Sequence, residues 1–390
     1  MAEYRDPEVP VDALAPADLA AKIAADEPVR LLDVRNRDEV EAWHIDGPSV
    51  TTTLIPYMKW LQADAQNAVT ERAAEIEGEG PVVTVCGEGE ASAYVASLLS
   101  EAGVEAQNLE GGMRGWARVY EAREVRREPA VVQFRRPSSG CLSYMIVSGG
   151  EAAVVDPLRA FTDRYLADAA DRGAEIVAVL DTHVHADHVS GLRDLSDVAG
   201  ACRLLSGPAL ERGVTYHVET VADSEGIEVG DATIEATALP GHTTGMFGVV
   251  VGDVLLSGDS LFLDGVARPD LQDGPDPGDL ASELHATLTD RLGRFEDGTV
   301  LAPGHYEPTT APGESGTYTD SLGAVRERVR AFEETTGAFV DRVTGADVPE
   351  PANAERIVAV NLGRESASGD DAFELELGPN NCAASPATGD

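Results

Sequence analysis

The sequence predicts an α/β protein of two domains, a small parallel-sheet domain followed by a larger domain of strands and helices. Its 390 residues exceed the size of one average domain, and a hydrophobic content of 43% is ample for two buried cores. Short β-rich runs alternate with helical segments over residues 14–121, which is typical of a parallel sheet. Further along the chain, several β-rich runs each end at a histidine or an aspartate.

The elements of the first domain follow in order along residues 14–121. β-rich runs predict strands at Arg30 to Val34 and Pro81 to Val85. Helical patterning predicts helices at Pro16 to Ala25, Ala91 to Ala102 and Glu110 to Glu121. We interpret the charged, poorly patterned residues 122–130 as a linker. The second domain then covers residues 131–378, and the small and polar residues 379–390 form a C-terminal tail.

The second domain carries a histidine-rich loop at the end of a predicted strand. The strand is Glu175 to Leu180, the loop is Thr182-His183-Val184-His185-Ala186-Asp187-His188, and we expect a helix at Val189 to Leu195. Three later segments end in a similar way. Ala232 to Leu239 leads to Gly241-His242-Thr243, the hairpin Val249 to Ser257 leads to Gly258-Asp259, and Thr299 to Ala302 leads to Gly304-His305.

These strand ends supply the candidate ligands of a metal site. Only 8 histidines occur in the chain, and five of them lie in the motifs just described. Neutral imidazole and carboxylate groups together suit zinc or iron(II). Ligand sites in α/β proteins lie at the carboxyl ends of strands, so we expect these side chains to converge. The predicted ligands are His183, His185, Asp187, His188, His242, Asp259 and His305.

Cys86 stands at the end of another predicted strand. It is followed by Gly87-Glu88-Gly89-Glu90 and then by the predicted helix at Ala91. Such a loop can turn backbone N–H groups toward the sulfur, and a helix N-terminus favours a thiolate. We predict a catalytic thiol at Cys86, with a docking role for the domain as the alternative. The other cysteines have no comparable loop and are interpreted as buried, inert thiols: Cys141, Cys202 and Cys382.

The charge balance limits the partners and the location. The formal net charge is −40, and all but two of the 29 basic residues are arginines. This composition indicates a halophilic protein, because a Debye length of about 3 Å at molar salt screens self-repulsion. It disfavours binding to nucleic acid or to an anionic membrane. The sequence has no membrane-spanning run and no apolar signal core, so we expect a cytoplasmic protein.

Two known families resemble these motifs. The series T-H-x-H-x-D-H, G-H-T, G-D and P-G-H resembles the metallo-β-lactamase superfamily over residues 131–378, which implies a four-layer αβ/βα sandwich with metal ions between its two sheets. Leu32 to Arg35, His44 to Gly47, the Cys86 loop and Asn108 to Trp116 resemble the rhodanese domain, a sulfurtransferase fold. The loop departs from that family at Ala91, where an arginine is common, and at Glu88 and Glu90.

The pairing of a sulfur-handling domain with this superfamily resembles the persulfide dioxygenases. Ser139 to Ile146, leading to Val155-Asp156-Pro157, is similar to their opening hairpin, and Arg268-Pro269-Asp270 is similar to their Arg-Thr-Asp motif. The resemblance implies one iron(II) per chain at His183, His242 and Asp259, with Arg268 as a catalytic residue. The substrate would be a small-molecule thiol persulfide, and the products sulfite and the parent thiol. A 2-His-1-carboxylate face leaves three coordination positions for sulfur and dioxygen.

Two other interpretations stay open. A hydrolase similar to glyoxalase II would cleave a thioester with two zinc ions per chain. One ion would use His183, His185 and His242, the other Asp187, His188 and His305, with Asp259 between them. All seven residues are present, so the ligand inventory does not decide. A non-enzymatic sulfur-binding or scaffold protein is the third interpretation. The sequence names neither the thiol that carries the substrate nor the oligomeric state, and a homo-oligomer stays open.

Overall fold

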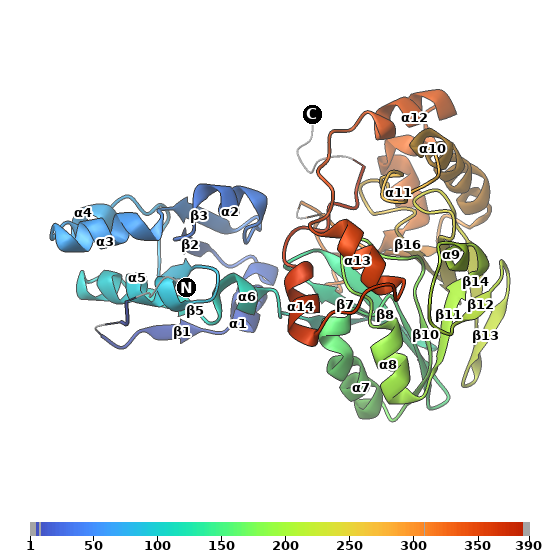
Figure 1. The fold of residues 1–390 in the computed structure, drawn as a ribbon, viewed down its shortest axis with the longest axis horizontal. Helices are drawn as coiled ribbons and strands as arrows, with labels where there is room; N and C mark the ends of the chain where they lie inside the picture. The colour runs from blue at the N-terminus through green and yellow to red at the C-terminus, as the bar shows by residue number, and fades with distance from the viewer. Residues whose placement is uncertain (1–4, 8, 308, 385–390) are drawn as a thin grey trace. The chain divides into compact units, whose positions relative to one another are not determined.

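The computed structural model describes residues 5–7, 9–307 and 309–384, and the chain folds into two compact units (Figure 1). The first unit is made of residues 1–120 with residues 136–139, and the second of the remaining chain. Each unit contains its own hydrophobic core. Within the described residues, no helix is long and apolar enough to cross a membrane.

The first unit is a parallel five-stranded sheet covered by helices on both faces. Its strands, in spatial order, are β1 (Asp12–Leu14), β5 (Ala106–Leu109), β4 (Val82–Val85), β2 (Val29–Asp33) and β3 (Val50–Leu54). Neighbouring residues of β2 point to opposite faces: Leu32 packs in a cluster with Trp60 and Tyr94, and Leu31 packs in another with Trp116. The helices are α1 (Pro16–Ala24), α2 (Arg37–Ala42), α3 (Tyr57–Ala65), α4 (Val69–Ala73), α5 (Glu90–Glu101) and α6 (Gly112–Trp116). The predicted α/β class with a small parallel sheet is confirmed.

The second unit contains two mixed sheets. The seven-stranded sheet has the order β12 (Glu219–Val221), β11 (Cys202–Ser206), β10 (Glu175–Leu180), β9 (Glu151–Val155), β8 (Cys141–Ser148), β7 (Ala130–Arg136) and β6 (Glu121–Arg127). The six-stranded sheet has the order β13 (Gly226–Val229), β14 (Ala232–Ala238), β15 (Phe247–Val251), β16 (Val254–Gly258), β17 (Val300–Pro303) and β18 (Asp320–Ser321). Ile146 and Leu180 of the first sheet share one core with Val249 and Leu256 of the second.

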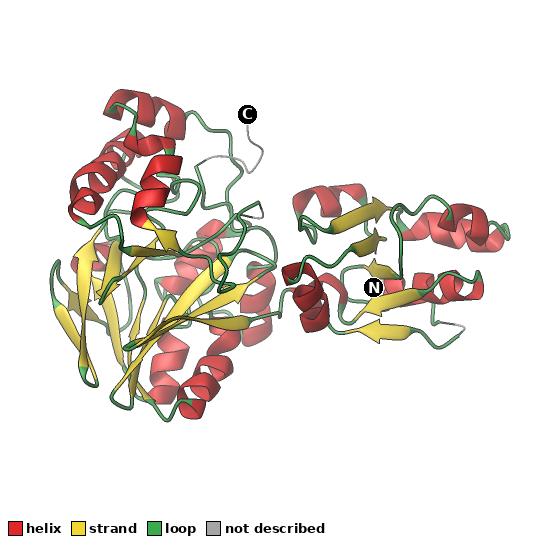
Figure 2. Ribbon diagram, turned by 180° about the vertical axis from the view of Figure 1, so that it is seen from behind, coloured by secondary structure: helices red, strands yellow, loops and turns green. Residues whose placement is uncertain are grey.

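Helices complete the layers of the second unit, and Figure 2 shows its strands between helical segments. Helices α7 and α8 contact β10, whereas Leu284 of α10 and Phe339 of α12 join the core of the six-stranded sheet. The helices are α7 (Thr162–Asp171), α8 (Leu192–Ala199), α9 (Gly207–Glu211), α10 (Pro277–Ala286), α11 (Leu322–Arg328), α12 (Thr336–Thr344), α13 (Ala354–Asn361) and α14 (Gly369–Leu375). Shorter turns lie at Arg159–Phe161, Thr287–Arg291, Leu292–Arg294 and Arg330–Phe332. The predicted four-layer sandwich is confirmed.

Three segments differ from the sequence expectation. Residues 122–130, expected as a linker, lie in β6, in the turn that follows it and at the start of β7. Strand β6 is at the edge of its sheet and half-exposed, so it tolerates charged residues and shows no apolar alternation. The predicted helix at Glu110 to Glu121 shortens to α6. The helix expected from Val189 begins only at Leu192, because the Leu192 amide donates to Ser190 Oγ at 2.9 Å.

The C-terminal segment also differs from the expected tail. Cys382 and Ala384 are buried, and the Ala384 amide donates to the Val266 carbonyl at 2.9 Å. Ala383 forms an isolated β-bridge with Ala267. Residues 379–384 are therefore part of the packed second unit, whereas residues 385–390 lie outside the described residues.

Candidate metal centre and cysteine loop

The histidine-rich loop is anchored to the end of β9 by Asp156. Its carboxylate accepts two hydrogen bonds from Thr182, one from the amide at 2.6 Å and one from the hydroxyl at 2.9 Å. Thr182 follows β10, which pairs in parallel with β9, so both strands end at the same edge. Asn361 of α13 supports the other side of the loop, because its side-chain amide donates to the carbonyls of His185 and His188. The ligand loop is thus held from both sides.

His183, His242 and Asp259 form the first cluster of candidate ligands. Oδ2 of Asp259 lies 3.8 Å from His183 Nε2 and 3.9 Å from His242 Nε2. All three side chains are buried. Gly304 permits this approach, because a Cβ there would lie 2.4 Å from Asp259 Oδ1. The three residues come from the ends of β10, β14 and β16, as the sequence predicts.

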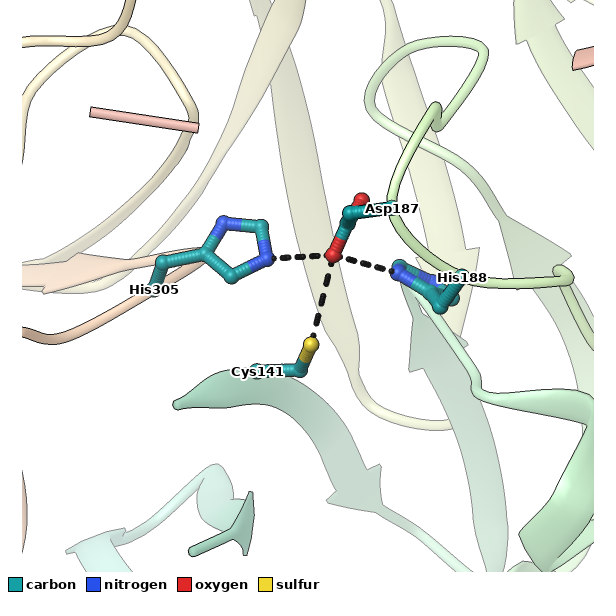
Figure 3. A group of neighbouring side chains, drawn as sticks. All are labelled: Cys141, Asp187, His188 and His305. Carbon is teal, nitrogen blue, oxygen red and sulfur yellow. Dashed lines mark hydrogen bonds and ion pairs between the residues drawn. The ribbon is translucent and has the colours of Figure 1, made fainter. Parts of the chain in front are cut away.

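Asp187 is the centre of a second cluster, shown in Figure 3. Its Oδ2 lies 2.9 Å from His305 Nε2, 3.1 Å from His188 Nδ1 and 3.3 Å from Cys141 Sγ. The other ring nitrogen of His305 lies 2.8 Å from Asp259 Oδ1. His305 therefore links the second cluster to the first.

In His183, His185 and His242, one ring nitrogen acts as a hydrogen-bond donor. The Thr182 hydroxyl donates to Asp156, so it accepts from His183 Nδ1 at 3.0 Å. His185 Nε2 lies 3.1 Å from Asp156 Oδ1, and a carboxylate oxygen can only accept. By the same reasoning, His242 Nδ1 donates to the Arg268 carbonyl at 2.7 Å. Histidines that bind metals typically donate their other ring N–H in this way.

The remaining atoms of these side chains fit a metal ion. Five buried atoms have no hydrogen-bond partner among the described residues: His183 Nε2, His185 Nδ1, His188 Nε2, Asp187 Oδ1 and Asp259 Oδ2. Leaving a buried polar atom without a partner costs about 1–3 kcal/mol, so five at one place call for a cation that accepts their lone pairs. Imidazole nitrogen and carboxylate oxygen are donors that suit zinc or iron(II).

The electrostatics of the cluster favour the ligand forms of these groups. Burial lowers the pKa of His183 well below its usual value, and burial also lowers the pKa of His242, which keeps both imidazoles neutral. Burial alone would raise the pKa of Asp187, but His188 and His305 hold that pKa well below its usual range. The carboxylate is therefore ionised.

Cys86 stands between β4 and α5, and hydrogen-bond donors surround its sulfur. The Gly89 amide lies 3.1 Å from Sγ, the Ser92 amide 3.4 Å and the Ser92 hydroxyl 3.2 Å. Gly89 has φ 92°, and a Cβ there would lie 3.0 Å from the Gly111 amide nitrogen, so glycine suits this position. Glu88 and Glu90 are exposed rather than turned into the protein. The Ser92 hydroxyl was not anticipated from the sequence.

Two thiols that the sequence analysis took as inert lie in the metal centre. Cys141 contacts Asp187, and the sulfur of Cys382 lies within 4.8 Å of ligand atoms of Asp259 and His305. Neither thiol stands near the histidine motifs in the sequence, so no spacing pattern could reveal it. Arg268, predicted as catalytic, directs its guanidinium at the Asp270 carboxylate at 2.6 and 2.8 Å and at the Pro349 carbonyl at 2.7 Å.

Known proteins match both units of the chain. Residues 137–305 match the metallo-beta-lactamase superfamily, and residues 15–119 match the rhodanese-like domain. Hydroxyacylglutathione hydrolase of Xanthomonas euvesicatoria pv. vesicatoria is 31% identical over 184 residues, which cover 47% of this chain and 67% of that protein. Mitochondrial persulfide dioxygenase ETHE1 of Bos taurus is 25% identical over 177 residues, which cover 44% of this chain and 66% of that protein. The crystal structure of ETHE1 from Myxococcus xanthus is 25% identical with a TM-score of 0.53, covering 60% of this chain and 98% of that one.

The fold, the histidine–aspartate clusters and these matches define the class. The chain belongs to the metallo-beta-lactamase superfamily, and it carries a rhodanese-like domain before the superfamily domain. Both predicted family resemblances are confirmed. The chain spans slightly less than two thirds of the length of the bovine and human persulfide dioxygenases that it matches, at 66%.

Proposed function

We propose that this enzyme oxidises a low-molecular-weight thiol persulfide to sulfite, with one iron(II) ion held by His183, His242 and Asp259. The balanced reaction is R–S–SH + O₂ + H₂O → R–SH + H₂SO₃. The outer sulfur is oxidised, dioxygen is reduced, and the parent thiol leaves with one proton. The similarity to persulfide dioxygenases and the presence of a rhodanese-like domain support a sulfur substrate.

The observation that carries the proposal is the unequal state of the two clusters. In the first cluster, His183 Nε2 and Asp259 Oδ2 have no hydrogen-bond partner among the described residues and lie 3.8 Å apart, too far for a hydrogen bond with each other. In the second, Asp187 Oδ2 already receives His188, His305 and Cys141 at 2.9–3.3 Å, and the atoms left without a partner among the described residues are Asp187 Oδ1 and His188 Nε2. A single ion at the first cluster is therefore the arrangement that the contacts favour. An iron(II) ion held by these three residues would supply the oxygen chemistry that oxidation of the persulfide sulfur requires.

The other residues of the centre orient these ligands. The Arg268 carbonyl fixes the ring of His242, and Thr182 fixes that of His183. His305 holds Asp259 Oδ1, which leaves Oδ2 directed toward the two imidazoles. Holding reactants in a fixed geometry is worth up to roughly 7–11 kcal/mol of the barrier.

Metal analysis of the purified protein tests this proposal. We expect about one iron per chain and oxygen uptake with a small persulfide, both lost in His183→Ala and Asp259→Ala. Sulfite should form in proportion to the oxygen consumed. Two zinc ions per chain together with thioester cleavage would contradict the proposal.

A thioester hydrolase with two metal ions is the second candidate. Hydroxyacylglutathione hydrolase is similar at 31% identity, and His185 Nδ1 and His188 Nε2 are also buried atoms without a partner among the described residues. The seven candidate ligands would then hold two ions, which would supply a hydroxide nucleophile for thioester cleavage. Turnover of a hydroxyacyl thioester by the zinc-loaded protein, with no oxygen uptake by the iron-loaded protein, would favour this candidate.

We infer a sulfurtransferase role for the rhodanese-like domain, in which Cys86 Sγ carries the transferred sulfur. The donors at Gly89 and Ser92 can stabilise an anionic sulfur at Cys86. Thiosulfate-linked sulfur transfer is the assay for this role. A docking role for the domain remains the alternative. It predicts that the wild-type protein shows no thiosulfate-linked sulfur transfer.

A further inference from the structure

Cys382 places a thiol in the metal centre from the far end of the chain. The residue is 1% exposed and follows α14, well after the last histidine of the motifs. Its Sγ lies within 4.8 Å of ligand atoms of Asp259 and His305. Asp259 is a proposed iron ligand, so this sulfur is in the immediate surroundings of the ion.

The backbone of Arg268 contacts both Cys382 and His242, a proposed iron ligand. Its carbonyl accepts from His242 Nδ1 at 2.7 Å, and its amide donates to the Cys382 carbonyl at 3.0 Å. The guanidinium also donates to the Asn381 carbonyl at 3.5 Å. Because Arg268 is itself held by Asp270, the position of Cys382 is set relative to His242.

Cys382 differs from the other cysteines of the second unit. Cys141 donates to the Asp187 carboxylate at 3.3 Å, and Cys202 is a partly exposed residue of β11. Among the described residues, the Cys382 sulfur donates to the Asn380 carbonyl, at 3.5 Å. A thiol is a weak hydrogen-bond donor, so this contact holds the sulfur only weakly.

We propose that Cys382 accepts the outer sulfur of the small persulfide, so that the sulfur oxidised at the centre is carried by the protein. This inference rests on the proposed persulfide oxidation. The Cys382 sulfur attacks the outer sulfur of R–S–SH, a new S–S bond forms, the S–S bond of the small persulfide breaks, and the parent thiol R–SH leaves with the proton of the Cys382 thiol. The exchange is Cys–SH + R–S–SH → Cys–S–SH + R–SH, without net oxidation.

The proposal changes what determines the substrate. The parent thiol leaves before the outer sulfur is oxidised, so its identity affects the transfer step and not the oxidation step. With glutathione persulfide and coenzyme A persulfide we therefore expect different KM values and the same kcat. A kcat that changes in proportion to the carrier thiol would overturn the proposal.

Anaerobic labelling tests the transfer directly. The iron-loaded full-length protein is mixed with glutathione persulfide without oxygen, separated from the excess, denatured, alkylated and digested for mass spectrometry. We expect one additional sulfur on the Cys382 peptide in the wild-type protein and in the matched control Cys202→Ser. Absence of this adduct in the wild-type protein overturns the proposal, and this measurement needs no variant.

Variants separate transfer from metal binding. Cys382→Ser and Cys382→Ala should keep about one iron per chain, lose the adduct and lose at least tenfold in kcat/KM. Loss of iron from both variants would identify Cys382 as a ligand and overturn the proposal, as would unchanged kcat/KM. If the adduct forms but oxygen releases no sulfite from the labelled protein, the proposed oxidation fails while the transfer to Cys382 stands.

Discussion

Replacement of His305 by alanine separates a single-ion centre from a two-ion centre. His305 places its ring nitrogens 2.8 Å from Asp259 and 2.9 Å from Asp187. With one ion at the first cluster, His305 orients Asp259 and does not bind the ion. Removal of such an orienting partner typically costs 10–100-fold in metal affinity, or about 1.4–2.8 kcal/mol. His305→Ala should therefore keep its iron at saturating concentration, whereas His183→Ala should retain none.

The assay is metal content after anaerobic loading, followed by competition with a chelator for the dissociation constant. His305→Gln is the matched control, because its amide can still donate to one carboxylate and should recover part of the affinity. A wild-type protein with two ions, from which His305→Ala and His183→Ala each lose one, would refute the reasoning. His305 would then be a ligand like His183.

The loss of stability in His305→Ala should depend on whether metal is bound. Burial acts to lower the pKa of His305, but Asp259 and Asp187 raise that pKa well above its usual value, so the ring is a cation between two carboxylates. Removing one partner of a buried ion pair costs about 3–5 kcal/mol. The melting temperature of His305→Ala should fall more in the metal-free protein than in the loaded protein, where the ion supplies positive charge.

Other changes have equally definite outcomes. Arg268→Gln should lower both the melting temperature and the iron affinity, because Asp270 and the Cys382 segment lose their partner; a fall in kcat alone would show that the guanidinium acts on the substrate. Cys86→Ser should abolish thiosulfate-linked sulfur transfer and spare oxygen uptake. Unchanged transfer activity of this variant at molar salt would refute the catalytic role of Cys86 and leave the domain a docking role. Ser92→Ala removes one of three donors to Cys86 and should slow sulfur transfer by about tenfold, the value of one hydrogen bond to an anion, with recovery in Ser92→Thr. Removal of metal by a chelator should lower the melting temperature of the wild-type protein, and an unchanged value would contradict a buried ion.

The sequence predicted the strands that carry the ligands more reliably than the segments around them. Residues Glu175 to Leu180 form β10 as predicted, and the hairpin before Asp259 is β15 and β16. These segments are apolar and buried, so their patterning is strong. Strand β6 escaped notice because an edge strand with exposed charges lacks that patterning. Helix α8 begins late because the side chain of Ser190 serves the ligand loop.

The candidate site was predictable where its residues form a motif and not where they meet only through the fold. The histidines and Asp259 stand at strand ends, and parallel pairing alone brings several of them to one edge. Cys141 and Cys382 are separated by most of the second unit in the sequence, and both contact the centre. No local pattern encodes such a meeting. Ser92 was missed for a related reason, because its hydroxyl reaches from the first turn of α5 to Cys86, which lies six residues earlier in the chain.

The attachment of Cys382 to Arg268 has a practical consequence for handling the protein. Proteolytic cleavage after Gly378 would remove Cys382 together with its contact to the Arg268 amide. Preparations trimmed at this end should therefore behave as active-site variants although every histidine is intact. Intact mass measured before each metal analysis distinguishes a trimmed preparation from an unloaded one.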